Sequence, residues 1–499
     1  MAGCSEVLIP TVAMRILVRG APFGGGFVFC VWNLQPTLIF RVLGLCTGLF
    51  NHRWTLDNNH KEGHWLRIVL LSSARKRKIY TTTSQGNSFM QATREKFAPK
   101  VYLYPRIRKT PFYEAHKRAG CKAYSVYNHI YHPRYYDDMY KEYSKVVNGV
   151  TLWDVSVERQ VEISGPDAFA FTDFLTPRDL SKCKVGQCRY VVICDADGGI
   201  ISDPVLLRLE ENRFWLSTSD VDLLLWAKGV AVHSDMDVRI QEPDVSPVQI
   251  QGPKSPYVVR ALFGDSVLDL GYYTCTWAKL RGMDVVVSRT GFTAELGYEI
   301  FLTDSRVGNR ALELWNAILE AGRPYGIAVT GPTHIRALEA GILDYRCDMG
   351  LENNPFEVGL DYVVDLEKKA DYIGKAALKR IKAEGVKNKL VGLEIQGAPT
   401  YEWNWDTGAK EVPGWDTGDL WPVTHKGKKV GHLTKAFYSP RLKKNIGRAM
   451  VGIDYSKVGT EVNVETPAGS RAATVVSFAF HDPKKEIAKA NVKALLQAK

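Results

Sequence analysis

The chain has 499 residues, a formal net charge of +11, 45% hydrophobic residues and 24% charged residues. This length exceeds the usual span of one hydrophobic core, so we expect roughly two to four domains. The charge is concentrated at the N-terminus: residues 1–89 hold ten Lys and Arg against three Asp and Glu, and residues 90–499 hold 55 against 51. The main body is only mildly basic, which argues against a nucleic-acid partner.

The N-terminal 89 residues differ from the rest of the chain in amino-acid composition. Polar residues and a proline interrupt the apolar stretch 7–50, so we predict no clean membrane span and no stable membrane insertion. The basic run 75–78 in an acid-poor context is compatible with an organelle transit segment, which would imply a mitochondrial location. An upstream extension before Met90, outside the working protein, is an equal alternative. We expect residues 1–96 to be a poorly ordered extension.

The nine cysteines form no CxxC pair and no Cys/His cluster with zinc spacing. We therefore expect no metal site, and reduced thiols in a cytoplasmic environment. Cys183, Cys188 and Cys194 are interpreted as small core residues.

The ordered part is expected to begin near residue 106. Thr110 before a proline suits a helix start, and Gly120 its end. A polar-aromatic cluster that includes Tyr127 follows. A strand then enters a Gly-Pro turn at residue 165, and a helix is predicted from about 167 to 175.

Residues 190–217 read as a three-strand meander. One residue in it is unexpected, because Asp203 lies in the middle of a strand that otherwise contains Ile, Val, Leu and Pro. An ionised carboxylate is costly to bury there without a partner. A strand-end Asp that caps a turn is the structural alternative.

Beyond the meander we predict helices over 220–231, 254–263 and 306–321, and a hairpin that turns at Arg281-Gly282. Two glycines bracket a loop that leads to Glu299 at the start of a strand. Arg336 lies on the next helix, where an exposed helix charge is the plain interpretation.

The texture changes again near residue 385. Short strands separated by Gly- and Pro-rich loops predict a separate small β domain over 386–482. Residues 483–499 are predicted to be a basic tail that forms a solvated amphipathic helix.

Three separated segments now agree: the meander from Tyr190 to Asp203, the loop SRTGFTAELGYE and the helix with HIRALEAG. In this order and spacing the chain resembles the glycine-cleavage T-protein (aminomethyltransferase) superfamily, whose members transfer one-carbon units to tetrahydrofolate. The motifs KAYSVYNH, WDVSVERQVEISG and NNPFEVGLDYVV make it similar to the dimethylsulfoniopropionate demethylase branch, over roughly residues 105–450. T-proteins typically read DVSHMG where this chain reads DVSVER.

The resemblance implies an α+β fold, a three-domain cloverleaf of the aminomethyltransferase folate-binding type with a C-terminal small β-barrel domain. Residues 97–385 would form the folate-binding region as two intertwined subdomains, followed by the barrel over 386–482. The implied cofactor is tetrahydrofolate, and the implied partner is a small-molecule methyl or aminomethyl donor. The oligomeric state is left open.

The resemblance also implies roles for single residues. Asp203 falls on the catalytic aspartate, and Glu299 on the carboxylate that pairs with the pterin. The other implied residues are Tyr190, Ser217 and Arg336 at the folate, and Phe112, Tyr127 and Phe292 at the donor. A carboxylate can accept both donors of a pterin edge, arginine suits the carboxylates of the folate tail, and aromatic faces favour a cationic donor.

The donor is the open question. Demethylases usually read SGWSKQGGYE in the loop before Glu299 and T-proteins GYTGEDGYE, whereas here Phe292 replaces the Trp and Ala294-Glu295 replace the Lys-Gln pair. Methyl transfer from a sulfonium or a related donor to folate N5 is our first interpretation, and T-protein-type aminomethyl transfer is the alternative. A non-catalytic folate-binding assembly factor is a third, but the KGCYxGQ motif of such proteins is not found in the sequence. The dinucleotide fingerprint of a fused oxidoreductase is not found either.

Overall fold

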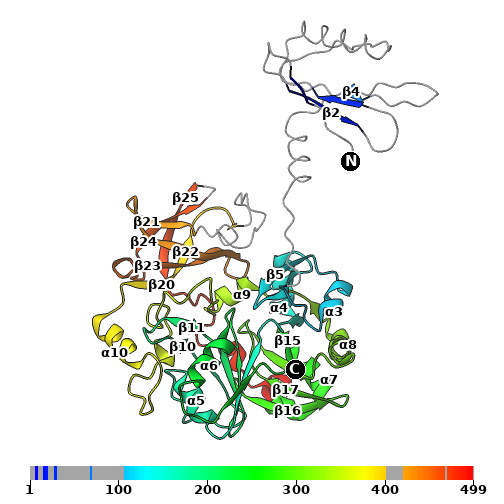
Figure 1. The fold of residues 1–499 in the computed structure, drawn as a ribbon, viewed down its shortest axis with the longest axis vertical. Coiled ribbons are helices and arrows are strands. Elements are labelled where there is room, and N and C mark those ends of the chain that lie inside the picture. Colours follow the sequence, from blue (N-terminus) through cyan, green and yellow to red (C-terminus); the bar gives the residue numbers. More distant parts are fainter. Residues whose placement is uncertain are drawn as a thin grey trace, which may run out of the picture. The chain divides into compact units, whose positions relative to one another are not determined.

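The computed structural model describes residues 106–400, 420–466 and 469–497, together with four short strands near the N-terminus. The chain divides into two compact units, Met1–Tyr102 and Leu103–Lys499. In the first unit, β1 (Glu6–Leu8), β2 (Arg15–Gly20), β3 (Phe27–Cys30) and β4 (Ile68–Val69) form an antiparallel sheet in that order (Figure 1). The predictions of a poorly ordered extension and of a transit segment otherwise concern residues outside the described ones.

A five-stranded antiparallel sheet forms one part of the second unit, in the order β14-β8-β13-β12-β9. Helices α5 (Ala168–Phe174) and α6 (Leu223–Ala231) pack against it through a buried apolar cluster that includes Phe171, Phe214 and Leu223. The strands are β8 (Gln160–Ser164), β9 (Cys188–Tyr190), β12 (Val205–Glu210), β13 (Arg213–Ser217) and β14 (Arg239–Gln241).

A six-stranded sheet in the order β16-β17-β18-β15-β7-β19 forms the second part. Only the β19–β7 pairing is parallel. Arg281 and Gly282 both have positive φ, at 50° and 81°, which gives the tight hairpin turn predicted there. Helices α7 (Ser255–Phe263) and α8 (Arg310–Gly322) cover this sheet, whose strands are β7 (Thr151–Asp154), β15 (Val245–Gln251), β16 (Cys275–Leu280), β17 (Met283–Ser288), β18 (Gly297–Thr303) and β19 (Ala328–Val329).

The C-terminal β domain is a closed barrel of six strands in the order β20-β23-β22-β21-β24-β25. Inward-facing residues of successive strands, among them Leu393, Leu433 and Val464, form its core. Helix α10 (Lys375–Glu384) precedes the barrel strands β20 (Asn388–Ile395), β21 (Pro422–His425), β22 (Lys428–Ser439), β23 (Lys444–Gly452), β24 (Glu461–Thr466) and β25 (Gly469–Val476) (Figure 1). The predicted α+β class with a small C-terminal barrel is confirmed.

The meander differs from its prediction at Asp203. The segment expected to be one strand is divided into β11 (Ile200–Ser202) and β12, and Asp203 and Pro204 lie in the break. Strand β11 pairs only with β10 (Ile193–Cys194), whereas β12 belongs to the five-stranded sheet. Pro204 has no N–H to donate to a ladder, which is why the strand stops here.

A two-stranded hairpin precedes both sheets. Strands β5 (Ala123–Tyr127) and β6 (Ile130–Tyr135) are joined by Asn128 and His129, which have φ of 49° and 60°. Helix α3 (Tyr113–Arg118) lies before the hairpin and α4 (Met139–Asn148) after it.

The C-terminal tail is not the solvated helix that the sequence predicts. It forms two short helices, α11 (Glu486–Lys489) and α12 (Val492–Gln497). Val492 is 1% exposed and packs into the core beneath α7 and α8. Arg289 donates to the carbonyl oxygens of Ala488 and Ala490 at 2.7 Å each. This long-range contact fixes the tail, and a local helical pattern cannot reveal it.

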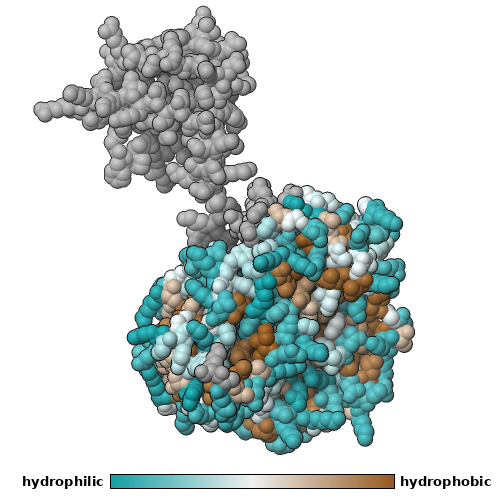
Figure 2. All heavy atoms as spheres, turned by 180° about the vertical axis from the view of Figure 1, so that it is seen from behind, coloured by the Kyte–Doolittle hydropathy of each residue, from teal (hydrophilic) through white to brown (hydrophobic). Residues whose placement is uncertain are grey.

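No described helix is long and apolar enough to cross a membrane. The face of the second unit in Figure 2 is mostly hydrophilic, with apolar residues in scattered groups. Such groups are normal on protein surfaces, so this face does not by itself indicate a protein partner.

Candidate functional site

The two sheets and the β5–β6 hairpin enclose a cavity of about 970 Å³. This is at the upper end of the range for small-molecule sites, about 300–1,000 Å³. Six of the residues implied by the resemblance line it: Tyr127, Tyr190, Asp203, Ser217, Phe292 and Glu299. They come from separate segments of the chain.

Strand register explains how each sheet contributes a row of side chains. In the six-stranded sheet Glu299 lies opposite Gln249, which lies opposite Trp153 on the next strand. In the five-stranded sheet Tyr190 and Ser217 both lie opposite Val205. All of these residues line the cavity.

Asp203 occupies the break between β11 and β12. The Tyr190 hydroxyl donates to its Oδ2 at 2.8 Å. Its Oδ1 is buried and has no hydrogen-bond partner among the described residues. Burial raises the pKa of Asp203 to about 7, although the hydrogen bond from Tyr190 and the nearby hydroxyl of Ser219 act in the opposite direction. Near neutral pH this carboxyl group can therefore either hold a proton or accept one.

Glu299 is held by two neutral side chains. Gln249 donates to its Oε1 at 2.6 Å, and the Thr290 hydroxyl donates to its Oε2. Burial raises the pKa of Glu299 despite these hydrogen bonds. The Oε1 of Gln249 is buried without a partner in the described part of the chain, and the side chain lines the cavity. A buried acceptor of this kind is available to a donor on a ligand or to a water molecule.

Sequence reasoning missed a further carboxyl group in the cavity, Glu158. It lies in the turn between β7 and β8, and Ser217 donates to its Oε2 at 3.2 Å. Burial and then the nearby charge of Glu299 raise its pKa well above the usual range. Its signal was present in the sequence, because DVSVER has Glu158 where the DVSHMG of T-proteins has a methionine. Gln249 was also missed, because only strand register places it beside Glu299.

Two predicted residues lie outside the cavity lining. Arg336 on α9 (His334–Glu339) is fully buried, and its Nε donates to Glu295 at 2.7 Å. Phe112 is also fully buried and packs against Trp315, with ring centroids 5.6 Å apart. The structure thus gives Arg336 and Phe112 positions in the protein core, and we do not include them in the proposed site.

Aromatic side chains form another part of the lining. Tyr127 comes from the hairpin, and Phe292 lies against a small core cluster with Trp153 and Val155. Trp153 is 1% exposed, so it serves mainly in packing. Tyr127 and Phe292 remain the candidates for contact with a cationic group.

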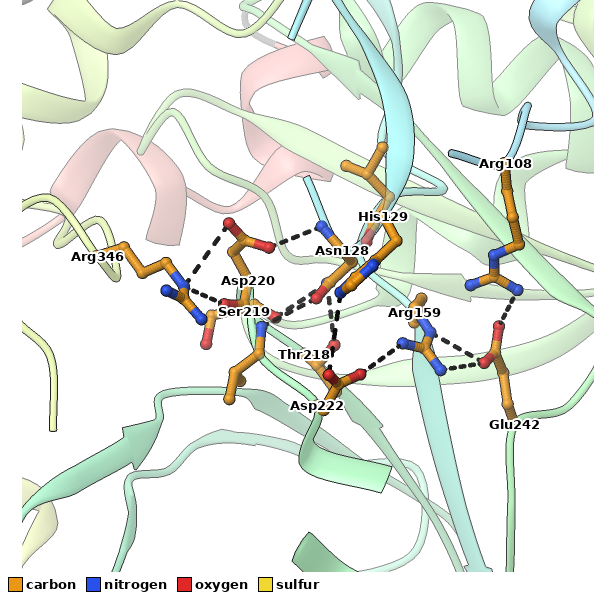
Figure 3. Close-up of polar contacts among 12 residues, drawn as sticks. Arg108, Asn128, His129, Arg159, Thr218, Ser219, Asp220, Asp222, Glu242 and Arg346 are labelled. Atoms are coloured by element: carbon orange, nitrogen blue, oxygen red, sulfur yellow. Dashed lines mark hydrogen bonds and ion pairs between the residues drawn. The ribbon is translucent and has the colours of Figure 1, made fainter. Parts of the chain in front are cut away.

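A polar network beside the cavity connects the hairpin turn to the loop after β13, as Figure 3 shows, and we refer to the residues of this network as the rim. Asn128 is 1% exposed; its Nδ2 donates to the carbonyl oxygens of Val157 and Ser219 at 2.9 Å each. Its Oδ1 accepts from the backbone N–H of Val221, and its own backbone N–H donates to Asp220. The turn is therefore fixed against the five-stranded sheet, which holds Tyr127 at the cavity.

A buried ionic cluster connects the cavity to the barrel. Lys435 on β22 donates to Asp344 at 2.7 Å, and His334 lies 3.5 Å from the same carboxylate. The adjacent Lys435 holds the pKa of Asp344 well below its usual value, even though burial acts in the opposite direction. Burial lowers the pKa of His334 to about 4, so this imidazole is neutral at pH 7. The described residues contain no group of three or more His, Cys, Asp or Glu arranged to bind a metal ion.

These residues fit a reduced folate. Glu299 and Gln249 offer adjacent acceptor atoms for the donor edge of a pterin, and Asp203 offers a further unpaired oxygen. The cavity is also large enough for a second small molecule beside the pterin.

Comparison with known proteins agrees with this fit. Residues 112–368 match the model of the GCVT N-terminal domain, and residues 415–482 match that of the glycine cleavage T-protein C-terminal barrel domain. The dimethylsulfoniopropionate demethylase DmdA of Ruegeria pomeroyi is 36% identical over 375 residues, which cover 75% of this chain and 98% of the relative. An aminomethyltransferase of Thermotoga neapolitana is 31% identical over 383 residues, which cover 75% of this chain and 98% of the relative.

A solved structure shows the same fold. The crystal structure of the glycine cleavage system aminomethyltransferase T from Bartonella henselae superposes with a TM-score of 0.65 at 22% sequence identity, over 76% of this chain and 99% of that one. The fold, the cavity and the matches define an enzyme, a tetrahydrofolate-dependent methyl or aminomethyl transferase. The chain belongs to the glycine cleavage T-protein family.

Proposed function

We propose that this enzyme transfers a methyl group from a sulfonium donor of the dimethylsulfoniopropionate type to N5 of tetrahydrofolate. The observation that carries the proposal is Asp203, a cavity carboxyl group with an unpaired oxygen and a pKa of about 7. The resemblance to the Ruegeria pomeroyi demethylase, at 36% identity against 31% for the Thermotoga neapolitana aminomethyltransferase, supports methyl rather than aminomethyl transfer.

Tetrahydrofolate, when bound, supplies the nucleophile of the reaction, a secondary amine. Glu299 and Gln249 orient its pterin edge, while Tyr190 and Ser217 line the cavity from the five-stranded sheet. Methyl transfer breaks the carbon–sulfur bond of the donor, both electrons remain on sulfur, and a neutral thioether leaves. The proton released at the methylated nitrogen passes to Asp203, whose pKa suits a general base near pH 7.

A sulfonium needs little acid catalysis, because the leaving thioether carries no negative charge. The residues of this cavity therefore contribute mainly by alignment and proximity, which can supply up to about 7–11 kcal/mol of the barrier reduction. Two rows of side chains on two packed sheets suit that purpose, because neither row depends on a mobile loop for its position.

Aminomethyl transfer is the second candidate, and the observation that favours it is the sequence of the loop 291–296. Its Ala294-Glu295 differs from the Lys-Gln of demethylases, and Glu295 accepts hydrogen bonds from Arg336 and Arg441. This glutamate is therefore part of the buried structure beside the cavity rather than an exposed donor contact.

The experiment incubates the full chain with tetrahydrofolate and, separately, with dimethylsulfoniopropionate, a lipoyl aminomethyl carrier protein and a panel of methylated amines. Mass spectrometry follows 5-methyl- and 5,10-methylene-tetrahydrofolate, together with the released thioether. We expect the methyl product with the sulfonium and its loss in Asp203→Asn. Methylene-folate from the carrier, without sulfonium turnover, would establish aminomethyl transfer instead.

We also propose that the enzyme works in the cytoplasm. The six cysteines in the described ranges are free, which suits a reducing environment. A mitochondrial location is the alternative if residues 1–89 are a transit segment. Fluorescent fusions of the full chain and of the chain from Met90 would distinguish the two, because only a functional transit segment makes their locations differ.

A further inference from the structure

Arginine–carboxylate pairs surround the hairpin turn at the rim, whereas, among the described residues, Asp203, Glu299 and Glu158 in the cavity have no such pair. At the rim, Figure 3 shows arginines paired with carboxylates. Arg159 donates through Nε to Glu242 at 2.9 Å and through Nη1 to Asp222 at 3.3 Å. Arg108 donates to the other oxygen of Glu242 at 3.0 Å. Arg159, which follows Glu158 in the sequence, therefore pairs with Glu242 and Asp222 and not with Glu158.

A second rim arginine is paired in the same manner. Arg346 donates to the backbone oxygen of Asp220 at 2.7 Å, and its Nε lies 3.8 Å from the Asp220 carboxylate. Figure 3 shows this pair on the far side of Asn128 from Arg159. Both Arg346 and Asp220 line the cavity, where they are matched to each other, and Arg134 of the same lining lies 2.7 Å from His334.

Three carboxyl groups of the cavity lining have only neutral hydrogen-bond partners, whereas Asp344 in the same lining is paired with Lys435. Asp203 is bonded by Tyr190, Glu299 by Gln249 and Thr290, and Glu158 by Ser217. Within the part of the chain that the structure describes, none of these three carboxyl groups forms an ion pair. Carboxyl groups buried without a cation are costly, so their presence together indicates a ligand that compensates for them.

Folate accounts for two of the three. The donor edge of a pterin matches Glu299 with the unpaired Oε1 of Gln249, and an amine matches the unpaired Oδ1 of Asp203. Glu158 is then the carboxyl group without a folate partner, in the same cavity and bonded to Ser217 of β13. A cationic co-substrate would supply the missing charge, and the aromatic ring of Tyr127 lines the same space.

We infer that Glu158 is a specificity-determining residue that makes the cavity selective for a positively charged methyl donor, a sulfonium or a quaternary ammonium. The inference rests on the proposed function where it calls the ligand a methyl donor. The predicted preference of the cavity for a cation does not depend on that function. Burial and the Glu299 charge, which raise the pKa of Glu158, also agree with a group that ionises when a cation arrives.

Charge can be separated from shape with matched ligands. Dimethylsulfoniopropionate and 4-methylpentanoate have nearly the same shape and the same carboxylate, but only the first has a cationic centre. Trimethylsulfonium and tetramethylammonium carry the cation without a carboxylate. Titration calorimetry on the full chain in the absence of tetrahydrofolate measures the affinity of each ligand, because without a methyl acceptor no turnover occurs.

The variant is Glu158→Gln, which keeps the size of the side chain and an oxygen that can accept from Ser217. We expect wild type to prefer dimethylsulfoniopropionate over 4-methylpentanoate, and Glu158→Gln to lose roughly 10- to 100-fold in affinity for the cations. Its affinity for 4-methylpentanoate should stay unchanged or rise. The matched control is Glu242→Gln, which removes a carboxylate bonded to Arg159 at the rim and not in the cavity lining; its cation affinity should equal that of wild type.

The outcomes separate this inference from the proposed function. If cation affinity depends on Glu158 but the enzyme does not turn over the sulfonium, the inference holds and the proposed reaction is overturned. Sulfonium turnover with the same cation affinity in wild type and Glu158→Gln would overturn the inference and leave the reaction standing. An equal loss in Glu158→Gln for the cations and for 4-methylpentanoate would also overturn it, because the residue would then act through shape.

Discussion

Asp203 should lower the stability of the free enzyme in a pH-dependent manner. Burial raises its pKa from 3.8 to about 7, a difference that corresponds to about 4 kcal/mol. A carboxyl group whose pKa is raised on folding binds its proton more tightly in the folded state. The free energy of unfolding therefore falls as the pH rises from about 4 to about 7, and the full cost is present above that range.

Replacement of Asp203 by Asn removes this cost and keeps an oxygen that can accept from Tyr190. The value of about 4 kcal/mol is an upper bound, because Asp203 is partly exposed to the cavity and water there screens its charge. We expect the variant to be more stable than wild type by about 2 kcal/mol at pH 8, which corresponds to a rise in Tm of about 2–3 °C for a unit of this size. At pH 4 the two proteins should melt together.

Differential scanning calorimetry at pH 4, 6 and 8 on the full chain measures this, with methyl transfer assayed in parallel. Asp197→Asn is a matched control, since Asp197 lies exposed in the nearby turn 195–199. Its stabilisation, if any, should not grow with pH. A Tm difference for Asp203→Asn that is zero at pH 8, or that is the same at pH 4 and pH 8, would refute the assignment of Asp203 as a buried, proton-binding carboxyl group.

Three further changes test other parts of the site. Tyr190→Phe removes the hydrogen bond that lowers the pKa of Asp203, so the midpoint of kcat/KM against pH should move upward; an unmoved midpoint would show that Asp203 is not the group that titrates. Glu299→Gln should weaken folate binding roughly 10- to 100-fold in calorimetry, and an unaltered Kd would remove Glu299 from the pterin site. Lys435→Met leaves Asp344 buried without its main cation and should cost about 3–5 kcal/mol in denaturant unfolding, part of which Asp344→Leu in the same chain should recover; no recovery would mean that the pair is not the cause.

Much of the site could be predicted because its residues belong to separated motifs in a fixed order. Tyr190 and Asp203 belong to one motif and Glu299 to another almost 100 residues later, yet all three line one cavity. What made Asp203 noticeable was a carboxylate in an apolar segment, and the structure explains it by a break in the strand at Pro204. Asp203 and Pro204 are tolerated side by side because the backbone at this break makes no ladder hydrogen bond, which proline could not donate.

The residues that sequence reasoning missed depend on contacts between distant strands. Gln249 lies among apolar residues of β15, and only the register with β18 places it beside Glu299. Arg336 shows the reverse case: its motif was located, but its partner Glu295 lies 41 positions earlier and holds it in the core. Motif position specifies where a residue lies along the chain, but the direction of its side chain follows from packing.

The distribution of charge argues for a division of labour between the rim and the interior. Arg159 is bonded to the carboxylates of Glu242 and Asp222, and Arg346 to the backbone oxygen of Asp220, so both arginines fix the segments around the hairpin turn. Asp203, Glu299 and Glu158 have hydroxyl and amide partners instead, so no cationic side chain is hydrogen-bonded to them in the described part of the chain. If a rim arginine reached Glu158, the cavity would lose its preference for a cation while keeping its folate contacts. Donor selection and folate binding are therefore assigned to two different carboxyl groups, Glu158 and Glu299, which are close enough that the charge of Glu299 adds to the effect of burial in raising the pKa of Glu158.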